Sequence, residues 1–462
     1  MFPLEGLCDF FTAFLFPYLQ MERRRMMGRK GLFVVVLLVT VAVQQNVLGQ
    51  ELKTNPLWAK TDQFSSELEP KCISWRRDIH QNPELGNREF RTSKLIAEHL
   101  QLLGMEVKTG IAHTGVVGIL RGKQDTPVVA LRAEMDALPV TEAVDVPFAS
   151  KVRTMYEGKE VGVMHACGHD AHTAILMAVA EVLLKIKDEL PGTVKFIFQP
   201  AEEGVPKGEE GGASLMVRQG VLESPKPDVI FGLHVIAPIP TGMIGYRSGA
   251  FMASSDGLKI VIKGSSTHGA LPWYGVDPTV IASQVILGLQ TIVSRQTDLT
   301  ATPAVVTIGS IQGGIRFNII PDRVEMLGTI RVLDSKIQKE IHERIRKTAT
   351  MIAESAGAKA EITIDPGTPV VFNDPGLTQK MIPTLERIAG KGRSFTALQV
   401  TAGDDFAYYQ EKIPGLFFFV GITPEGNKGA PNHSPHFYVD ERGLIVGIRA
   451  MANLAVDYLT SK

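Results

Sequence analysis

One short segment of the chain holds a dense group of side chains that can bind metals. The run His165-Ala166-Cys167-Gly168-His169-Asp170-Ala171-His172 places three imidazoles, a thiol and a carboxylate within eight residues. These groups are ligands that zinc and other borderline-soft cations prefer. No second Cys/His pair follows at zinc-finger spacing, so the segment predicts one part of a composite site. The structural alternative is that these side chains only cap and pack the start of a helix.

A pair of adjacent carboxylates, Glu202 and Glu203, is the second chemical feature. They lie in the motif FQPAEEG, directly after an apolar strand predicted over 194–198. Like charges this close disfavour each other unless a cation compensates them. A metal site resolves the conflict if one carboxylate coordinates and the other stays free as a base. For the pair alone a solvated loop is the alternative, because Glu209 and Glu210 follow closely.

Three further motifs carry acidic or imidazole side chains, two of them at the ends of predicted strands and the third near the C-terminus. They are Glu134-Met135-Asp136, Gly232-Leu233-His234-Val235 and Asn432-His433-Ser434-Pro435-His436. Each motif alone is weak, because a lone histidine is more often a structural residue than a ligand. Together they bring acids, a thiol and imidazoles to one edge of a sheet. This convergence is what a two-metal hydrolase requires.

The elements around these motifs predict an α/β fold. Continuous apolar strands alternate with helical patterns, which indicates a mostly parallel central sheet with helices on both faces. Helical spacing runs from about residue 64 to 103, and an Ala-rich helix is expected over 171–186. The strands are predicted at 115–120, 128–131, 194–198 and 229–233.

The pattern of predicted elements changes in the middle of the chain. Six elements follow in the order strand, helix, strand, strand, helix, strand, which is the ferredoxin-like pattern. Because α/β patterning resumes after about residue 369, we expect an α+β domain inserted into the first one. The six elements are predicted at 258–263, 278–293, 304–308, 324–331, 335–356 and 359–364.

The first fifty residues predict export. Basic residues at 23–25, 29 and 30 precede an apolar run over 32–43, which is typical of a secretory signal. The run is short for a membrane span of about 20 residues, and an uncleaved membrane anchor is the alternative. We therefore expect a periplasmic or secreted protein whose translation starts at Met1, Met21 or Met27.

Composition excludes some classes of protein. The 462 residues carry 48 Lys and Arg against 49 Asp and Glu, and the net charge of −1 argues against nucleic-acid binding. Hydrophobic residues make up 44%, which predicts a packed globule. Cys8, Cys72 and Cys167 are too few for a disulfide framework. Cys167, between histidines, is expected to be a ligand or a reactive thiol.

The chain resembles the amidohydrolase branch of the aminoacylase and carboxypeptidase metallopeptidases. The resemblance covers nearly everything from about Phe64 onward, and it is closer to bacterial members than to plant ones. Hippurate hydrolases, N-acyl-amino-acid amidohydrolases and auxin-conjugate hydrolases belong to this branch. The resemblance implies cleavage of the amide bond of an N-acyl amino acid or a similar small conjugate. The motifs that carry it are MHACGHDAH, FQPAEEG, GLHV, THGALPW, RFNIIPD and NHSPHF.

Carried over residue by residue, the resemblance implies two divalent cations in each subunit. Glu202 would be the general base, Asp136 would orient a ligand, and Asn318 would lie near the substrate. His268 on the inserted domain would reach the active site of a partner subunit, in a homodimer or higher oligomer. The thiolate favours Mn, Zn, Co or Ni over Mg or Ca. The implied ligands are Cys167, His169, Glu203, His234 and His433, with His436 as the alternative to His433.

The expected organisation follows from these assignments. Residues 1–50 form an N-terminal extension and signal peptide, 62–250 and 368–462 form the two parts of the catalytic domain, and 251–367 form an inserted lid and dimerisation domain. Two positions depart from the family's usual pattern. Glu134 stands where Asp is common, and Asp404 stands where Glu is usual.

Three alternatives to this function stay open. The nearest is a metallo-carboxypeptidase or dipeptidase acting on short peptides. A cysteine hydrolase using Cys167 as nucleophile would be inhibited by thiol alkylation rather than by chelators. A non-catalytic binding protein on the same fold would typically lack a ligand or the base, whereas all of these residues are present here.

Overall fold

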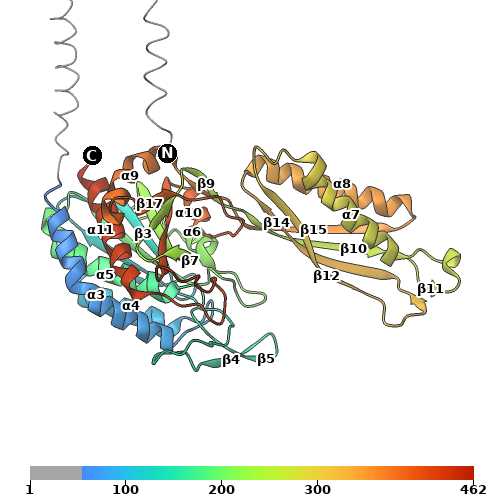
Figure 1. Cartoon of the computed structure of the whole chain (residues 1–462), viewed down its shortest axis with the longest axis horizontal. Helices are drawn as coiled ribbons and strands as arrows, with labels where there is room; N and C mark the ends of the chain where they lie inside the picture. The colour runs from blue at the N-terminus through green and yellow to red at the C-terminus, as the bar shows by residue number, and fades with distance from the viewer. Residues whose placement is uncertain (1–54, 462) are drawn as a thin grey trace, which may run out of the picture. The chain divides into compact units, whose positions relative to one another are not determined.

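The computed structural model describes residues 55–461, so the expected signal segment lies outside the described residues. Its largest sheet, to which the strands labelled β3, β7 and β17 in Figure 1 belong, has eight strands in the order β1-β2-β6-β3-β7-β18-β8-β17. The four central strands β6, β3, β7 and β18 run parallel to one another, whereas β2 pairs antiparallel with β6 and β8 pairs antiparallel with β18. The strands are Glu106–Ile111 (β1), Gly115–Arg121 (β2), Val128–Glu134 (β3), Thr193–Gln199 (β6), Val229–Pro240 (β7), Ile244–Tyr246 (β8), Ser394–Thr396 (β17) and Gly415–Thr423 (β18).

Helices cover both faces of this sheet. Successive side chains of a strand point to opposite faces, so the strands contribute to two separate cores, one under each layer of helices. Leu131 belongs to the core on one face, and its neighbour Ala130 belongs to the core on the other. The larger core packs under Trp58–Gln81 (α3), Phe90–Leu102 (α4), His169–Lys185 (α5), Pro375–Ala389 (α9) and Leu444–Thr460 (α11). The smaller core packs under Gly212–Arg218 (α6) and Ala407–Gln410 (α10). The α/β class expected from the sequence is confirmed.

Glu441–Thr460, which contains α11, is long and apolar enough by composition to cross a membrane. However, 72% of its apolar window is buried inside the protein, which is the pattern of a core helix.

The remaining short elements of the catalytic part are a hairpin, Arg153–Tyr156 (β4) with Lys159–Gly162 (β5), and the 3-10 turns Lys187–Glu189 (η1) and Glu441–Gly443 (η3).

Three sequence expectations need correction. The helical pattern over 64–103 forms two helices, because Pro83 and Gly86 interrupt it between α3 and α4. Strand β7 runs on to Pro240 alongside β18, so His234 lies inside a strand rather than at its end. Strand β18 itself was not predicted, although its run of nine residues is fully buried.

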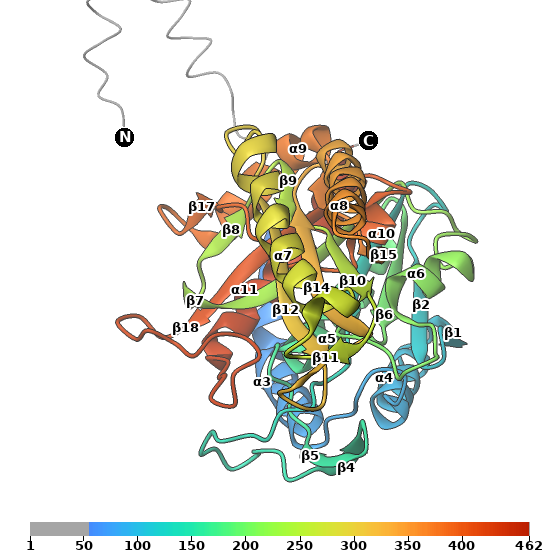
Figure 2. The ribbon, with the colours of Figure 1, turned by 90° about the vertical axis from the view of Figure 1, so that its right-hand side faces the viewer.

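The inserted domain has a four-stranded antiparallel sheet in the order β12-β14-β10-β15, which is the ferredoxin-like order. Helices α7 and α8 lie side by side on one face of this sheet (Figure 2) and close a core of their own. Its elements are Ser255–Lys263 (β10), Pro278–Gln296 (α7), Ala304–Gly313 (β12), Arg323–Val332 (β14), Ser335–Ser355 (α8) and Lys359–Thr368 (β15), with the short ribbon Thr267–His268 (β11) and Ile319–Ile320 (β13) and the turn Pro272–Tyr274 (η2).

The chain enters and leaves this domain through adjacent strands. Gly249–Met252 (β9) precedes the domain and Val371–Asn373 (β16) follows it, and the two pair antiparallel. An insertion whose two ends lie together leaves the host fold undisturbed.

Candidate metal centre

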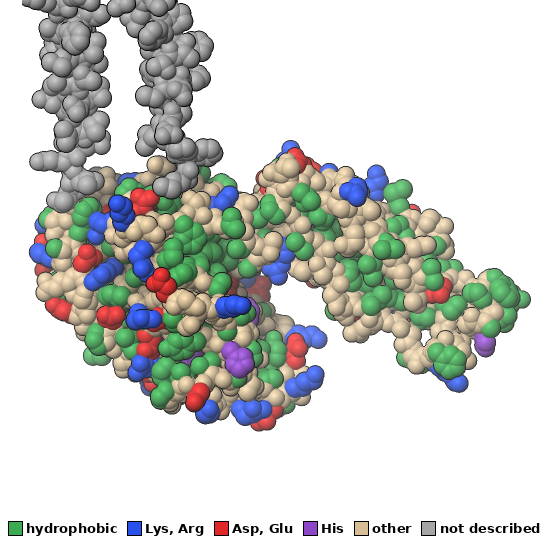
Figure 3. Space-filling view, in the orientation of Figure 1, with side chains coloured by type: hydrophobic (Ala, Val, Ile, Leu, Met, Phe, Trp, Pro, Cys, Tyr) green, Lys and Arg blue, Asp and Glu red, His purple; other side chains and the backbone are tan. Residues whose placement is uncertain are grey.

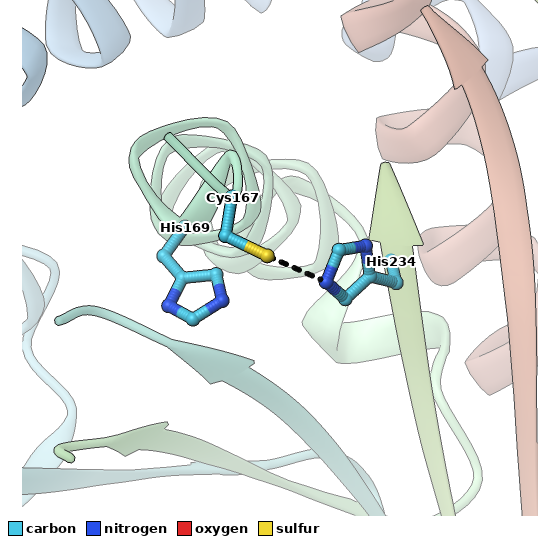
Figure 4. A group of neighbouring side chains, drawn as sticks. All are labelled: Cys167, His169 and His234. Carbon is cyan, nitrogen blue, oxygen red and sulfur yellow. Dashed lines mark hydrogen bonds between the residues drawn. The ribbon is translucent and has the colours of Figure 1, made fainter. Parts of the chain in front are cut away.

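Cys167 and His169 are placed by the start of α5. Gly168, the residue before the helix, has φ of +94°, a conformation that other residues rarely adopt. This turn brings the Cys167 Sγ to 3.3 Å from the Nε2 of His234 on β7. Figure 4 shows the two side chains facing each other with His169 beside them. A buried thiol and two buried imidazoles thus converge from a helix start and a strand.

Each of these imidazoles is oriented through its other nitrogen. The Nδ1 of His169 lies 3.1 Å from Asp136 Oδ1, and the Nδ1 of His234 lies 2.7 Å from the carbonyl oxygen of Val235. When Nδ1 donates its proton to these oxygens, the lone pair remains on Nε2, which is how ligand histidines are commonly held. The Nε2 of His169 is buried without a hydrogen-bond partner. A cation would satisfy it.

Glu203 and His433 extend the cluster. The backbone N of Glu203 donates to Asp136 Oδ2 at 2.9 Å, so a single carboxylate fixes both His169 and Glu203. The Nε2 of His433 lies 3.1 Å from Glu203 Oε1. His433 adopts φ of +68°, and its backbone N donates to the carbonyl of Ala166 at 2.7 Å. The C-terminal motif is thereby tied to the loop that carries the thiol.

The structure therefore brings all five predicted ligands together. In each of two groups, the possible ligand atoms lie within 4.8 Å of one another: Cys167, His169 and His234 in one, and Cys167, Glu203 and His433 in the other. Cys167 belongs to both groups, so its sulfur could serve as a ligand in either of them.

Glu202 lies beside this cluster. Its carboxylate and the possible ligand atoms of His169 and Glu203 also lie within 4.8 Å of one another. One of its oxygens accepts a long hydrogen bond, 3.4 Å, from the backbone N of Asp405. Burial, followed by the negative charge of Asp404, Glu203 and other carboxylates, raises the pKa of Glu202 well above its usual value. A carboxyl group in these surroundings readily takes up a proton.

The electrostatics of the cluster also fit cations. Burial and the carboxylates of Glu203 and Glu202 raise the pKa of the Cys167 thiol well above its usual range. Without positive charge the sulfur would therefore stay protonated, and it would be a poor nucleophile. Divalent cations would stabilise the thiolate and offset the crowded carboxylates. The donor set thus fits a metal centre better than a cysteine nucleophile.

The model of the M20/M25/M40 peptidase family matches residues 130–457. The chain belongs to this family. It is 41% identical over 396 residues to thermostable carboxypeptidase 2 of Saccharolobus solfataricus, covering 85% of this chain and 96% of that relative. It is 40% identical over 387 residues to N-acetylcysteine deacetylase of Bacillus subtilis, covering 84% and 96%.

A solved structure agrees with these relatives. The crystal structure of Bacillus subtilis YxeP, described as a dinuclear metal binding peptidase from the M20 family, matches with a TM-score of 0.72 at 37% identity. The match covers 86% of this chain and all of that one. The family and the enzyme class expected from the sequence are confirmed. The chain is an M20-family metal-dependent hydrolase, and its cofactor is a pair of divalent cations whose identity is not fixed.

The site also depends on residues to which the sequence analysis assigned no role. Arg132 is fully buried and donates to Asp405 and Gln199, while Asn432 donates to the carbonyl oxygens of Cys167 and Val235. His172 accepts from the backbone N of Val235 at 2.8 Å, so it holds β7 in place. Asn432 and His172 stand inside recognised motifs, and that position is the one sequence signal that could have marked them.

His268 and Asn318 lie on the inserted domain, at its β11–β13 ribbon. His268 is opposite Ile319 in the ribbon, and Gly269 N donates to the Asn318 carbonyl at 2.9 Å. Within residues 55–461, neither side chain has a hydrogen bond or ion pair to the metal-centre residues. The alternative ligand His436 is exposed, with its backbone N bonded to Ser434 Oγ.

Proposed function

We propose that the protein hydrolyses the amide bond of N-acyl amino acids or similar small amide conjugates, using two divalent cations held by Cys167, His169, Glu203, His234 and His433. The observation that carries this proposal is the convergence of these donors from four separate chain segments, with Glu202 left beside them. The name of the Bacillus subtilis relative, N-acetylcysteine deacetylase, supports an N-acyl amino acid as substrate.

The cations would supply Lewis acidity, polarising the amide carbonyl and making water acidic enough to attack near neutral pH. Glu202 takes a proton from the attacking water at its carboxylate and returns it to the nitrogen of the leaving amine. Asp136 holds the His169 ring and the Glu203 backbone in place throughout. The thiol and imidazole donors favour Mn, Zn, Co or Ni over Mg or Ca.

Replacing Glu202 by Gln tests this assignment. The variant should keep both cations, because Glu202 is not among the proposed ligands, and it should lose about 10²–10⁴-fold in kcat. Elemental analysis and steady-state kinetics on an N-acetyl amino acid measure the two effects. Glu203→Gln is the matched control, and we expect it to lose metal as well as activity. A Glu202→Gln enzyme with a nearly normal rate would refute the base assignment.

The acyl and amino-acid preference is open to direct measurement. A panel of N-acetyl, N-benzoyl and dipeptide substrates, each assayed with added Mn, Co, Ni and Zn, separates the two candidate functions. Faster turnover of dipeptides would favour a carboxypeptidase or dipeptidase. The 41% identity to a thermostable carboxypeptidase supports this alternative. Metal-independent turnover, or none with any substrate, would contradict the proposal.

We further propose that the active form is a homodimer or higher oligomer in which His268 completes the partner's active site. The end of the inserted domain that carries β11 exposes many large apolar side chains (Figure 3). Ile315 and Phe317 are 99% and 97% exposed, and Trp273 is 70% exposed. Exposed apolar patches of this kind mark protein–protein contacts. Analytical ultracentrifugation should show an assembly larger than one chain.

Export is the last part of the proposal. The basic and apolar stretch before residue 50 supports a cleaved signal peptide. Sequencing the N-terminus of the protein purified from its native cells should give a start near residue 50, in the periplasmic or secreted fraction. An intact N-terminus in the membrane fraction would indicate an anchor instead.

A further inference from the structure

A buried guanidinium, that of Arg132, lies next to the candidate metal centre among three carboxylates. Its Nη1 is 2.9 Å from Glu134 Oε1, and its Nη2 is 2.7 Å from Asp405 Oδ1 and 3.3 Å from Asp404 Oδ1. All four side chains are buried. One guanidinium thus pairs with three carboxylates, and displacing any of them would leave a buried charge poorly compensated.

Two of these carboxylates also face the histidines of the centre. Glu134 Oε2 is 3.2 Å from His172 Nδ1, and Glu134 Oε1 is 3.9 Å from His169 Nε2. Oxygens of Glu134 and Asp404 and a nitrogen of His234 lie within 4.8 Å of one another. Because His172 Nε2 accepts from the backbone N of Val235, its Nδ1 carries the proton that faces Glu134.

Asp405 differs from this pair. Besides Arg132, it accepts hydrogen bonds from Gln199 Nε2 and from the backbone N of Ala213. These bonds hold it in place independently of Glu134. Asp404 Oδ1 also accepts from the backbone N of Phe406 at 2.8 Å. Glu134 and Asp404 are paired instead by their shared position beside His234 and Arg132.

The length of each of these two side chains is constrained by its backbone at one end and by the contacts of its carboxylate at the other. Glu134 is the last residue of β3, and Asp404 precedes α10, so both backbones are fixed. One extra methylene on Asp404 would advance its carboxylate by about 1.5 Å towards Glu134 and His234. One methylene fewer on Glu134 would withdraw its carboxylate from His172 and leave a cavity. Making both changes keeps the summed length.

We propose that Glu134 and Asp404 are a length-matched pair of positioning residues that hold His234 and the His169–His172 turn in register for the two cations. The inference rests on the proposed two-metal function.

The test compares Glu134→Asp, Asp404→Glu and the double exchange E134D/D404E with the wild type. Cobalt(II) affinity is measured by chelator competition, together with the visible spectrum of the cobalt-saturated protein. Each single variant should bind cobalt at least about tenfold more weakly and shift the visible bands, because a displaced ligand histidine alters the ligand field. The double exchange should return the affinity to within about threefold of the wild type and restore the bands.

E134D/D405E is the matched control. Asp405 also contacts Arg132, but its carboxylate is held by Gln199 and the backbone N of Ala213, so this combination should restore nothing. If the affinity losses of the single variants multiply in E134D/D404E, or if either single variant keeps the wild-type affinity and spectrum, the pair is not matched and the inference fails. A merely structural role would lower the melting temperature of the metal-free protein without moving the cobalt bands.

Circular dichroism shows whether the variants fold. Folding restored only in the double exchange would support the pair, and failure of the double exchange to fold would overturn it. These readouts do not depend on a substrate. A wild type that binds two cobalt ions yet hydrolyses no amide would refute the proposed function and leave the length-matched pair standing.

Discussion

At the scale of the residue, Cys167 is the side chain on which both ligand groups depend. Its sulfur lies 3.3 Å from His234 Nε2, and it also belongs to the group formed with Glu203 and His433. We predict that Cys167→Ala loses at least one cation from each subunit, because it removes the donor common to the two groups. Elemental analysis after dialysis measures the loss.

Cys72 provides the control for that substitution. It is fully buried in α3 and belongs to the larger core rather than to the cluster. Cys72→Ala should keep both cations and lose only the stability that a small cavity costs, on the order of 1 kcal/mol. Full metal occupancy in Cys167→Ala would refute the ligand role of the thiol.

Lys195 is a second residue whose chemistry follows from burial. Its ammonium donates to the carbonyl oxygens of Val221 and Glu223, and burial lowers its pKa from 10.5 to about 8. Between these values the unfolded chain binds more protons than the folded one, so stability from this group rises with pH from about 8 to 10.5. Below pH 8 its burial opposes folding in full.

We therefore predict that Lys195→Met flattens this rise. Between pH 8 and 10.5, the unfolding free energy of the wild type should increase by about 1–3 kcal/mol more than that of the variant. Urea titrations at several pH values measure the difference. Lys187→Met, at an exposed position, should leave the slope unchanged. Parallel curves for the wild type and Lys195→Met would contradict the prediction.

Residue types and spacing predicted which side chains would meet, but not what holds them. Cys167, Glu203 and His433 belong to local motifs that carry their own chemical signature. Arg132 and Asp405 do not, because an arginine inside an apolar strand and a second aspartate in a loop look ordinary until the fold packs them together. Buried networks of this kind depend on tertiary contacts and leave no local pattern.

At the scale of the element, the start of α5 sets the geometry of the site. A Cβ at Gly168 would lie 2.3 Å from the Cγ2 of Val235, and the residue also has positive φ. We predict that Gly168→Ala displaces the turn between Cys167 and His169, weakening metal binding at least about tenfold. The backbone strain alone should cost about 1–3 kcal/mol of stability.

Gly158→Ala separates the two effects. Gly158 has φ of +78° in the turn between β4 and β5, and nothing lies within 4 Å of a Cβ placed there. This variant should lose a similar amount of stability, measured by urea unfolding, and bind metal normally. If Gly168→Ala also binds metal normally, the turn does not set the ligand geometry.

Elements with a strong local pattern were predicted well. Helix α5 begins at His169 rather than near 171, and strands β3 and β6 lie where their apolar runs indicate. Strand β18 was missed because an isolated run of phenylalanines does not reveal its partner. His234 was placed at a strand end because β7 continues beyond β3 only through its pairing with β18, a long-range contact.

At the scale of the whole molecule, the inserted domain was predictable because its six elements form a complete pattern. Its helices and strands close a core of their own, and the host chain enters and leaves through β9 and β16. What the sequence could not supply is how His268 meets a metal centre, since no contact within one described chain joins them. The proposed oligomer offers a physical answer, because a partner subunit can provide the missing imidazole.

Subunit mixing distinguishes a partner's His268 from one acting within its own chain. His268→Ala and Glu202→Gln should each be nearly inactive as pure proteins. In the proposed oligomer the His268 imidazole would donate a hydrogen bond to the oxyanion formed from the amide carbonyl, and a donor of this kind is worth about 10²–10³-fold. In a heterodimer, however, the subunit with an intact Glu202 receives His268 from the Glu202→Gln subunit. Random exchange of equal amounts makes half of the dimers mixed, each with one working site, so about a quarter of the wild-type activity should return. If native mass spectrometry detects mixed dimers but activity stays absent, His268 does not act across subunits.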